Sequence, residues 1–541
     1  MHANRIDLSG NPLSWALVPL LVLAGGAMAQ KTIYEPSFLA REGIDLKDCN
    51  TPYCYDRSVQ TDNWIILWQK GFGTDPSTAS GTYKVNMANL KAVAEKSYAY
   101  YRDSLKMVLK GQSLTDTHKM MIFLLYQTEW AAYGSGQDDK VGSLHVDPAA
   151  ANIASVVAHE IGHCFEYMTG ADVPGAGWRW GFAANGDGGN GFWEQIAQWE
   201  AFSLYPEQKF RDNFAEYIAA NHLNMLHETP RYANHFIGDW WSYLHGRDFM
   251  GKLWRAAKRP EDPVDTYKRL VGVTQERFDD EMFEHAARLT TWDLPTIKTL
   301  GAGKVDSRPQ VKMTLGADSY WMVDKSMALE NYGYNSVKLN APANATTVSV
   351  KFKGKAGAGG YRSLNVAKGG WRYGFVALMK DGTRVYSEMA TARYADGANP
   401  EGSLAFAVPA NCSKLWLVVS GAPQEHWHHA WDDNDDNDEQ WPYAVQLGNT
   451  NLLGQPNPPV SSVAEASGPS RAFEVRGELL RLAPDVEELQ IRSMDGHQVR
   501  AFGSTAVDRS IPLVALPRGI LLVRARSVGS DRWSQGSLVN P

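Results

Sequence analysis

The spacing of apolar residues along the chain changes near residue 300. Before that point, apolar side chains recur every three or four positions between residues 84 and 110, which predicts an amphipathic helix. Short apolar runs at 120–126 and 142–146 predict strands, and Asp147-Pro148 then supplies the cap and first position of a helix through residue 168. Further helices are predicted over 192–204 and around 209–227, 234–246, 249–258 and 275–288.

After residue 300 the pattern is that of short strands. Runs such as TTVSVKFKG and KLWLVVSG are separated by Gly, Pro and Asn, which predicts an antiparallel sandwich. Residues 451–470 have the composition of a linker, and the last part of the chain returns to short strands. We therefore expect an α+β domain over residues 30–302, a β-sandwich domain over 303–450 and a small C-terminal β-sandwich over 471–541.

The first 29 residues predict a secretory signal peptide. Arg5 gives weak positive charge, residues 13–23 form an apolar core too short to cross a bilayer, and Ala27-Met28-Ala29 is a small-x-small cleavage site. We expect the mature chain to begin near Gln30, to have no membrane span and to be secreted or held at the cell surface. A retained anchor helix is the alternative interpretation.

Charge and cysteine content narrow the class of protein. The chain has 53 Lys and Arg residues against 60 Asp and Glu residues, a net charge of −7, which argues against a nucleic-acid partner. Four cysteines are too few for a disulfide scaffold. In an oxidising compartment Cys49 and Cys54 could close a small structural loop, whereas Cys164 and Cys412 are expected to be buried thiols.

The strongest chemical signal is the pentapeptide His159-Glu160-Ile161-Gly162-His163. Residues i and i+4 of a helix lie on one face, so both imidazoles can reach one metal ion, and Glu160 beside them can act on a water molecule. A helix with two surface histidines is the alternative. Because catalytic zinc usually has three protein ligands and a water, a third ligand is expected from another element.

Glu194 is the favoured third ligand. It stands at the start of the predicted helix 192–204, where the chain returns from the glycine-rich loop 185–191. Glu200 lies six residues further on and would point to another side of the helix. A solvated carboxylate at the helix start is the alternative for Glu194. Competing third ligands are His222, His227 and His235.

This arrangement resembles the zinc metallopeptidases called gluzincins, in which a strand, an HExxH helix and a later helical Glu form the active site. The resemblance implies an α+β zincin-like catalytic domain, with zinc bound by His159, His163 and Glu194 and with Glu160 as general base. The class often has an acid four residues after the ligand Glu, and this chain has Gln198 there. Segments such as VVAHEIGHCFEYMTG and WDDNDDNDEQWPYAVQL also resemble a family of exported bacterial proteins of unassigned function.

The expected reaction is hydrolysis of peptide bonds in an extracellular protein or glycoprotein by metal-activated water. A second donor for the tetrahedral oxyanion is expected from the segment 227–243, which offers Arg231, and Tyr232 and His235 are the candidates. Two alternatives stay open: an exported glycan- or surface-binding protein with a structural or inactive metal site, and a metal hydrolase acting on a glycan or ester.

A second cluster is the acidic run WDDNDDNDEQW at 431–441. Asp432, Asn434 and Asp436 match the first three ligand positions of an EF-hand calcium loop. However, Asn437 and Tyr443 stand where an EF-hand has its Gly and its Glu. A structural Ca²⁺ and a solvated acidic loop both fit this composition. The neighbouring His426, His428 and His429 offer a second transition-metal site as a further alternative.

Residues 472–541 resemble the C-terminal β-sandwich domains that address exported bacterial proteins to the cell surface or medium. The resemblance implies contact with the export machinery through this domain. The Asp495-Gly496 pair between two strand-like runs predicts a hairpin. An ordinary accessory β domain is the alternative.

Overall fold

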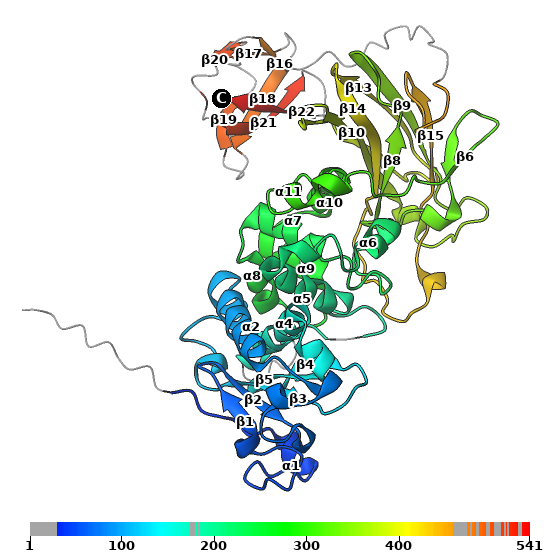
Figure 1. Ribbon diagram of the computed structural model, residues 1–541. Helices are drawn as coiled ribbons and strands as arrows, with labels where there is room; N and C mark the ends of the chain where they lie inside the picture. Colours follow the sequence, from blue (N-terminus) through cyan, green and yellow to red (C-terminus); the bar gives the residue numbers. More distant parts are fainter. Residues whose placement is uncertain are drawn as a thin grey trace, which may run out of the picture.

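The computed structural model describes residues 30–173, 179–181 and 183–457, and in the C-terminal part residues 473–476, 479–482, 486–493, 498–502, 510–512, 516, 519–527 and 533–540. The predicted signal peptide and most of the predicted linker lie outside the described residues. The expectation of a mixed α and β protein with several sheets is confirmed (Figure 1).

The N-terminal sheet has five strands in the order β1-β2-β3-β5-β4. Strands β2, β3 and β5 are parallel, whereas β1 and β4 pair antiparallel at the two edges. Every residue of β2 and β3 is buried, because both faces of these strands are covered. The strands are β1 (Ser58–Gln60), β2 (Trp64–Trp68), β3 (Met120–Leu124), β4 (Ala132–Gln137) and β5 (Val141–Val146).

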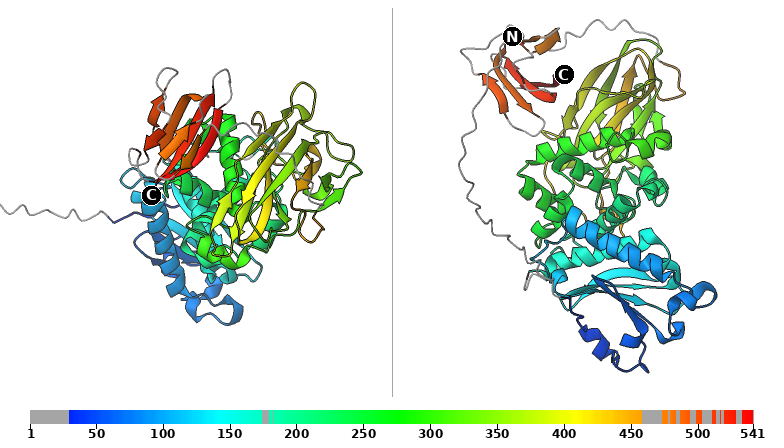
Figure 2. Two further views of the ribbon diagram at one scale, coloured as in Figure 1. Left: turned by 90° about the horizontal axis from the view of Figure 1, so that it is seen from above. Right: turned by 60° about the vertical axis from the view of Figure 1, so that its left-hand side comes forward.

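Helices fill the space between this sheet and the β domain (Figures 1 and 2). Helices α2 and α4 contribute to one large core together with the inner face of the sheet. The helices are α1 (Ser37–Arg41), α2 (Met87–Ala99), α3 (Pro148–Ala151), α4 (Ala154–Ala171), α5 (Gly191–Leu204), α6 (Phe214–Ala220), α7 (Phe236–His245), α8 (Phe249–Ala256), α9 (Pro263–Val271), α10 (Gln275–Thr290) and α11 (Lys298–Gly301).

The helix predicted through residue 168 is broken once. The side chain of Asp147 caps α3 as expected, by accepting from the amides of Ala149 and Ala150. The chain then leaves the helix at Asn152, whose side chain accepts from the amide of Asn86 and donates to the carbonyl of Lys84. These tertiary hydrogen bonds fix the break, so α4 starts afresh at Ala154.

Other helix predictions also differ from the structure, and of the helix predicted around 209–227 only Phe214–Ala220 forms. The helix predicted over 84–110 begins at Met87, where Asn86 caps it, and ends in one π turn, Tyr100–Ser104. Helix α9 was not predicted, although Asp262-Pro263 carries the same cap-and-proline signal as Asp147-Pro148.

The β domain consists of two packed sheets. One has the order β11-β10-β14-β8, with β12 also paired to β10, and the other has the order β13-β9-β15-β7-β6. Their inner faces meet where the rings of Phe352 and Tyr373 stack at 4.4 Å. The strands are β6 (Met313–Leu315), β7 (Trp321–Val323), β8 (Tyr334–Leu339), β9 (Thr346–Gly354), β10 (Gly370–Met379), β11 (Arg384–Tyr386), β12 (Ala390–Arg393), β13 (Glu401–Val408), β14 (Cys412–Gly421) and β15 (Tyr443–Gly448).

The outer face of β10 and β14 joins the helical core. Val376, Trp416 and Val418 point away from the sandwich interior and belong to the same apolar cluster as α10. The expected boundary near residue 302 is therefore a change of architecture and not a gap in packing.

The C-terminal part contains two small sheets, of order β16-β17-β20 and β19-β18-β21-β22. The predicted hairpin turn 494–497 lies outside the described residues, but the strands on either side of it, β18 and β19, pair antiparallel. The strands are β16 (Phe473–Arg476), β17 (Leu479–Leu482), β18 (Val486–Ser493), β19 (Gln498–Phe502), β20 (Ser510–Pro512), β21 (Gly519–Ser527) and β22 (Trp533–Asn540).

The cysteines lie as expected. Cys49 and Cys54 form a disulfide with their Cα atoms 5.1 Å apart, and Cys164 and Cys412 are buried thiols. In the part of the chain that the structure describes, no helix has both the length and the apolar character that crossing a bilayer requires.

Strand β4 packs directly on helix α4 because Gly134 has no side chain. A Cβ atom at this position would lie 1.9 Å from the carbonyl oxygen of Glu160. We predict that Gly134→Ala lowers the free energy of unfolding by about 1–3 kcal/mol, since the backbones of strand and helix must separate. Thermal or denaturant unfolding measures this. Gly303→Ala, where nothing lies within 4 Å, is the control, and equal stability of both variants would contradict the prediction.

Candidate metal centre

Helix α4 presents His159 and His163 on one face, one turn apart. Both side chains are buried, and their rings meet edge to face with centroids 4.7 Å apart. The Nε2 atoms are 3.1 Å from each other. The two imidazoles thus aim the same ring nitrogen at a common point.

Glu194 reaches this point from the first turn of α5. Its Oε2 atom lies 3.1 Å from Nε2 of His159 and 3.1 Å from Nε2 of His163. Helices α4 and α5 can approach closely because a Cβ at Gly162 would lie only 3.0 Å from the Cα of Ala197. The crossing of the two helices at Gly162 therefore places Glu194 over the imidazoles.

The three atoms form a triangle that suits zinc. Ligands held at about 2.0–2.1 Å from a tetrahedral zinc ion lie roughly 3.3 Å from one another, close to the 3.1 Å found here. Two imidazole nitrogens and one carboxylate oxygen are also the donor types that zinc accepts. The side chains brought together are those named from the sequence.

Glu166 contacts one of the two imidazoles from the buried side of α4. It lies three residues after His163 on α4, and its Oε2 atom is 2.8 Å from Nδ1 of His163. Burial raises the pKa of Glu166 to about 7. A carboxylate on the outer nitrogen fixes the tautomer of a metal-binding histidine and raises its basicity. Sequence reasoning missed Glu166, although its i+3 spacing from His163 was available as a signal.

His163, Glu166 and Glu194 shift one another's pKa values. Burial opposes charge on His163, yet hydrogen bonds with Glu166 and Glu194 raise its pKa well above the ordinary value. Burial of Glu194 is likewise outweighed by hydrogen bonds from His159 and His163, which hold the pKa of this carboxyl well below its ordinary value. Glu194 is thus a carboxylate, as a metal ligand must be.

Gln198 and Glu200 have other roles than metal binding. Gln198 donates to Oδ1 of Asn213 at 3.3 Å, and among the described residues Nδ1 of His159 has no hydrogen-bond partner. The Gln at this position therefore leaves His159 without the orienting acid of the gluzincin pattern. Glu200 is fully buried beneath Gly162, and burial raises its pKa well above the ordinary value.

The triangle lies in a cleft of about 560 Å³. One wall is the edge strand β4 with Tyr133 and Gly134, and the exposed Trp130 precedes it. Another wall combines Arg231 and Tyr232 with Trp431 from the β domain, whose ring lies 5.1 Å from the Arg231 guanidinium. No pattern in the sequence indicates Trp431, because its place in the cleft depends on how the two domains pack.

Glu160 and Tyr232 both line the cleft. The Glu160 side chain is buried next to the face of α4 that carries His159 and His163. The ring of Tyr232 lies 6.0 Å from that of His159, and burial followed by the charge of Glu194 raises the pKa of Tyr232 to about 12. Tyr232 is therefore a neutral hydroxyl that can donate into the cleft.

His235 was wrongly expected at the site. It is fully buried between Phe202 and Phe236, with ring centroids 5.0 and 4.1 Å away, and burial lowers its pKa well below the ordinary value. The ring lies in the core because His235 directly precedes α7, whose first residues are buried. His222 and His227, which the sequence also offers as third ligands, are not part of the triangle of His159, His163 and Glu194.

The calcium prediction on Asp432, Asn434 and Asp436 stays a prediction. All three side chains are exposed. Oδ1 of Asp432 accepts from the amide of Asn434, and Oδ1 of Asn434 accepts from the amide of Asp436. These oxygens cap the loop's own backbone.

Comparison with known proteins identifies the family of this chain. Residues 26–454 match the model of a family of unknown function, DUF6055. No curated protein matches the chain significantly.

Similar solved structures include the C-terminal family 22 carbohydrate-binding module of Clostridium thermocellum Xyn10B, 15% identical over 27% of this chain and 82% of that one, with a TM-score of 0.16. HBP35 of Porphyromonas gingivalis is 13% identical over 46% of this chain and 70% of that one, with a TM-score of 0.13.

From the contact between Glu166 and His163, we predict that removing the carboxylate of Glu166 lowers the affinity for zinc. We expect Glu166→Gln to weaken zinc binding about 10–100-fold, because a neutral amide orients the imidazole less well and adds no negative charge. Competition with a chromophoric chelator measures the dissociation constant. The exposed Glu207→Gln is the control, and an unchanged affinity of Glu166→Gln would show that this carboxylate does not support a metal ligand.

Proposed function

Because the chain belongs to DUF6055, a family of unknown function, we propose its function from its metal centre. We propose that it is a zinc-dependent metallopeptidase with a zincin-like domain, which hydrolyses peptide bonds of proteins or glycoproteins outside the cell. One observation carries the proposal: three ligand atoms that are mutually 3.1 Å apart lie in an open cleft that Glu160 also lines.

Three protein ligands favour catalysis over a structural role. A structural zinc site is closed by four protein ligands, whereas a catalytic site keeps one position for water or substrate. Among the described residues, the group of potential ligands at this point contains His159, His163 and Glu194 only. The side of the triangle that faces the cleft is left for water and substrate.

The residues of the cleft then have distinct roles. A bound zinc ion would supply Lewis acidity, which lowers the pKa of water and polarises a carbonyl oxygen. Glu160 takes a proton from the attacking water and delivers it to the leaving amine. The hydroxyl of Tyr232 donates a hydrogen bond to the oxygen that becomes negative. Glu166 keeps His163 oriented throughout.

The position of the N-terminal sheet's edge beside the cleft favours a peptide as the substrate. Strand β4 is the last strand of the sheet, and Ala132 to Ser135 line the cleft. An extended peptide can pair with such an edge through main-chain hydrogen bonds, alongside the scissile position. The aromatic residues Trp130 and Trp431 favour apolar side chains in that peptide.

An oxidising compartment fits this function. The Cys49–Cys54 disulfide forms and persists outside the reducing cytosol. The predicted signal peptide and the sorting-like C-terminal domain support the same location, so the substrate is proposed to be an extracellular protein or glycoprotein.

Glu160→Gln separates metal binding from catalysis. We expect the variant to keep the zinc content of the wild type and to lose peptidase activity at least about 100-fold, because an amide cannot accept the proton. Quenched fluorescent peptides, unfolded proteins and matched glycoproteins and oligosaccharides form the substrate panel. Undiminished proteolysis would refute the general-base role, and glycan binding without any hydrolysis would favour the surface-binding alternative.

Tyr232→Phe tests the oxyanion donor. We expect kcat to fall about 100- to 1,000-fold with little change in KM or zinc content, since the lost hydrogen bond forms only in the transition state. Steady-state kinetics on the best peptide of the panel measures both constants. Tyr243→Phe, an exposed tyrosine outside the cleft, is the control. A kcat equal to that of the wild type would assign Tyr232 a packing role only.

A further inference from the structure

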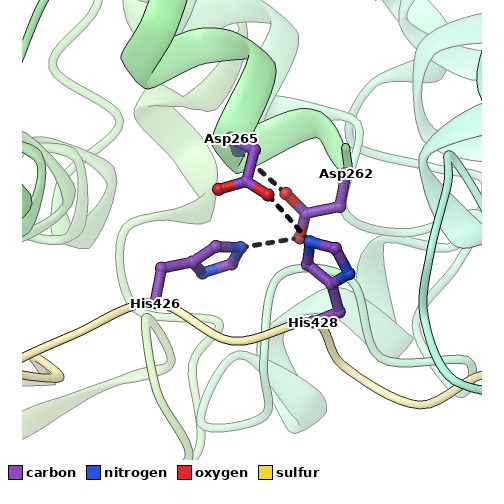
Figure 3. Close-up of side chains that lie close together, drawn as sticks. All are labelled: Asp262, Asp265, His426 and His428. Carbon is purple, nitrogen blue, oxygen red and sulfur yellow. Dashed lines mark hydrogen bonds and ion pairs between the residues drawn. The ribbon is translucent and has the colours of Figure 1, made fainter. Parts of the chain in front are cut away.

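A second group of metal-binding side chains lies at the junction between the helices and the β domain. Asp262 caps the N-terminus of α9, Asp265 lies in its first turn, and His426 and His428 belong to the segment that follows β14 (Figure 3). One potential ligand atom from each of the four side chains lies within 4.8 Å of the other three.

The spacing in the sequence explains this convergence. Asp262 is the N-cap of α9 and accepts from the amide of Asp265, which brings the two carboxylates to the same end of the helix. Residues 426 and 428 are two apart in the sequence, and the centroids of their rings lie 5.8 Å apart. Figure 3 shows the two imidazoles directed at the two carboxylates across the junction.

Each contact between the two pairs is short. Nε2 of His426 is 2.9 Å from Oδ2 of Asp262, and Nε2 of His428 is 2.8 Å from Oδ2 of Asp265. The inward atoms are thus two imidazole nitrogens and two carboxylate oxygens. These are four donors of the types found in closed, tetrahedral zinc sites.

The outward atoms are occupied by other partners. Nδ1 of His428 is bonded to Oδ1 of Asp187, and Nδ1 of His426 lies 3.0 Å from the hydroxyl of Tyr332. Oδ1 of Asp262 accepts from the amide of Asp265 at 2.8 Å. A carboxylate or hydroxyl on the outer nitrogen is the support that metal-binding histidines usually have.

A neighbouring cluster of similar composition lacks this arrangement. His227 lies near Glu330 and His429 on one side and near Asp435 and Asp438 on another, but its Nδ1 accepts from the amide of Thr229 at 3.0 Å. In the neutral ring the proton therefore sits on Nε2, which leaves no lone pair for a metal ion. The carboxylates of Asp435 and Asp438 are also 3.6 Å from Nε2 of His227.

We propose that Asp262, Asp265, His426 and His428 form a second site, which binds a structural divalent transition-metal ion of the zinc type. Asp262 is fully buried, whereas Asp265 is partly exposed and gives an ion access from solvent. The inference does not rest on the proposed peptidase activity, because it uses none of the residues of the catalytic cleft.

A metal ion at the second site would stabilise the structure of the cleft. Asp187, which supports His428, lies in the glycine-rich loop that leads to Glu194. Three residues after His428, the amide of Trp431 donates to the carbonyl of Ala184 in the same part of the chain, and the Trp431 ring lines the cleft. An ion bound by His428 therefore fixes both the loop before the third ligand and one cleft wall.

Metal counting on the full mature chain tests the proposal. The protein is stripped with a chelator, reloaded with zinc, freed of excess ion and analysed by mass spectrometry. We expect two zinc ions per chain in the wild type and one in the variant His426→Gln/His428→Gln. The variant His159→Ala/His163→Ala is also expected to keep one, and the control His227→Gln is expected to keep two.

The difference of one ion between the wild type and His426→Gln/His428→Gln decides the inference, even if the catalytic centre binds nothing. Equal zinc content in these two proteins overturns it, and so does loss of an ion in His227→Gln instead. Binding of Ca²⁺ but not of Zn²⁺ at this junction overturns the assignment to a transition metal.

If the variant His426→Gln/His428→Gln fails to fold, spectroscopy and thermal unfolding of other variants test the proposal. Co²⁺ added to His159→Ala/His163→Ala should give the intense visible bands of a tetrahedral ion, and Asp265→Asn in that background should lose them. Zinc should raise the unfolding temperature of His159→Ala/His163→Ala by several degrees and leave that of the Asp265→Asn form unchanged. Four side chains joined only by His–Asp ion pairs would show neither effect, and that result overturns the proposal.

Discussion

The close crossing of α4 and α5 at Gly162 is the contact on which the candidate metal centre depends. Side chains on the two helices interlock so tightly there that a methyl group on Gly162 would meet Ala197 and Glu200. Glu194 lies about one turn before Ala197 on α5, so this crossing also brings its carboxylate to the two imidazoles of α4. A wider crossing would leave a helix with two histidines and no third ligand.

Buried carboxyl groups surround the imidazoles on the protein side. Glu166 bonds to His163, and Glu200 lies beneath Gly162 without a hydrogen-bond partner among the described residues. Burial raises the pKa of both groups, whereas at Glu194 the hydrogen bonds from His159 and His163 outweigh burial and hold the pKa well below its ordinary value. Burying charge without a partner is costly, and a cation at the triangle would stabilise this arrangement.

The β domain takes part in the site as well as in the core. Its outer sheet face shares an apolar cluster with α10, and the segment after β14 passes along the glycine-rich loop and carries Trp431 into the cleft. Histidine–aspartate contacts between His426 or His428 and α9 hold that segment in place. The candidate site and the apolar core thus draw residues from both domains, although their sequence patterns differ clearly.

Local spacing in the sequence determined the parts of this protein that depend on local geometry. The i, i+4 period put His159 and His163 on one helix face, and Asp147-Pro148, the apolar runs and the Cys49–Cys54 spacing set helix starts, strands and the disulfide. Tertiary structure alone decided what depends on distant segments: the break at Asn152, the burial of His235 in the core, the place of Trp431 in the cleft and the meeting of Asp262 and Asp265 with His426 and His428. The physical reason is that a helix or strand period fixes which side chains share a face, whereas the partner of that face is chosen by packing across the whole chain.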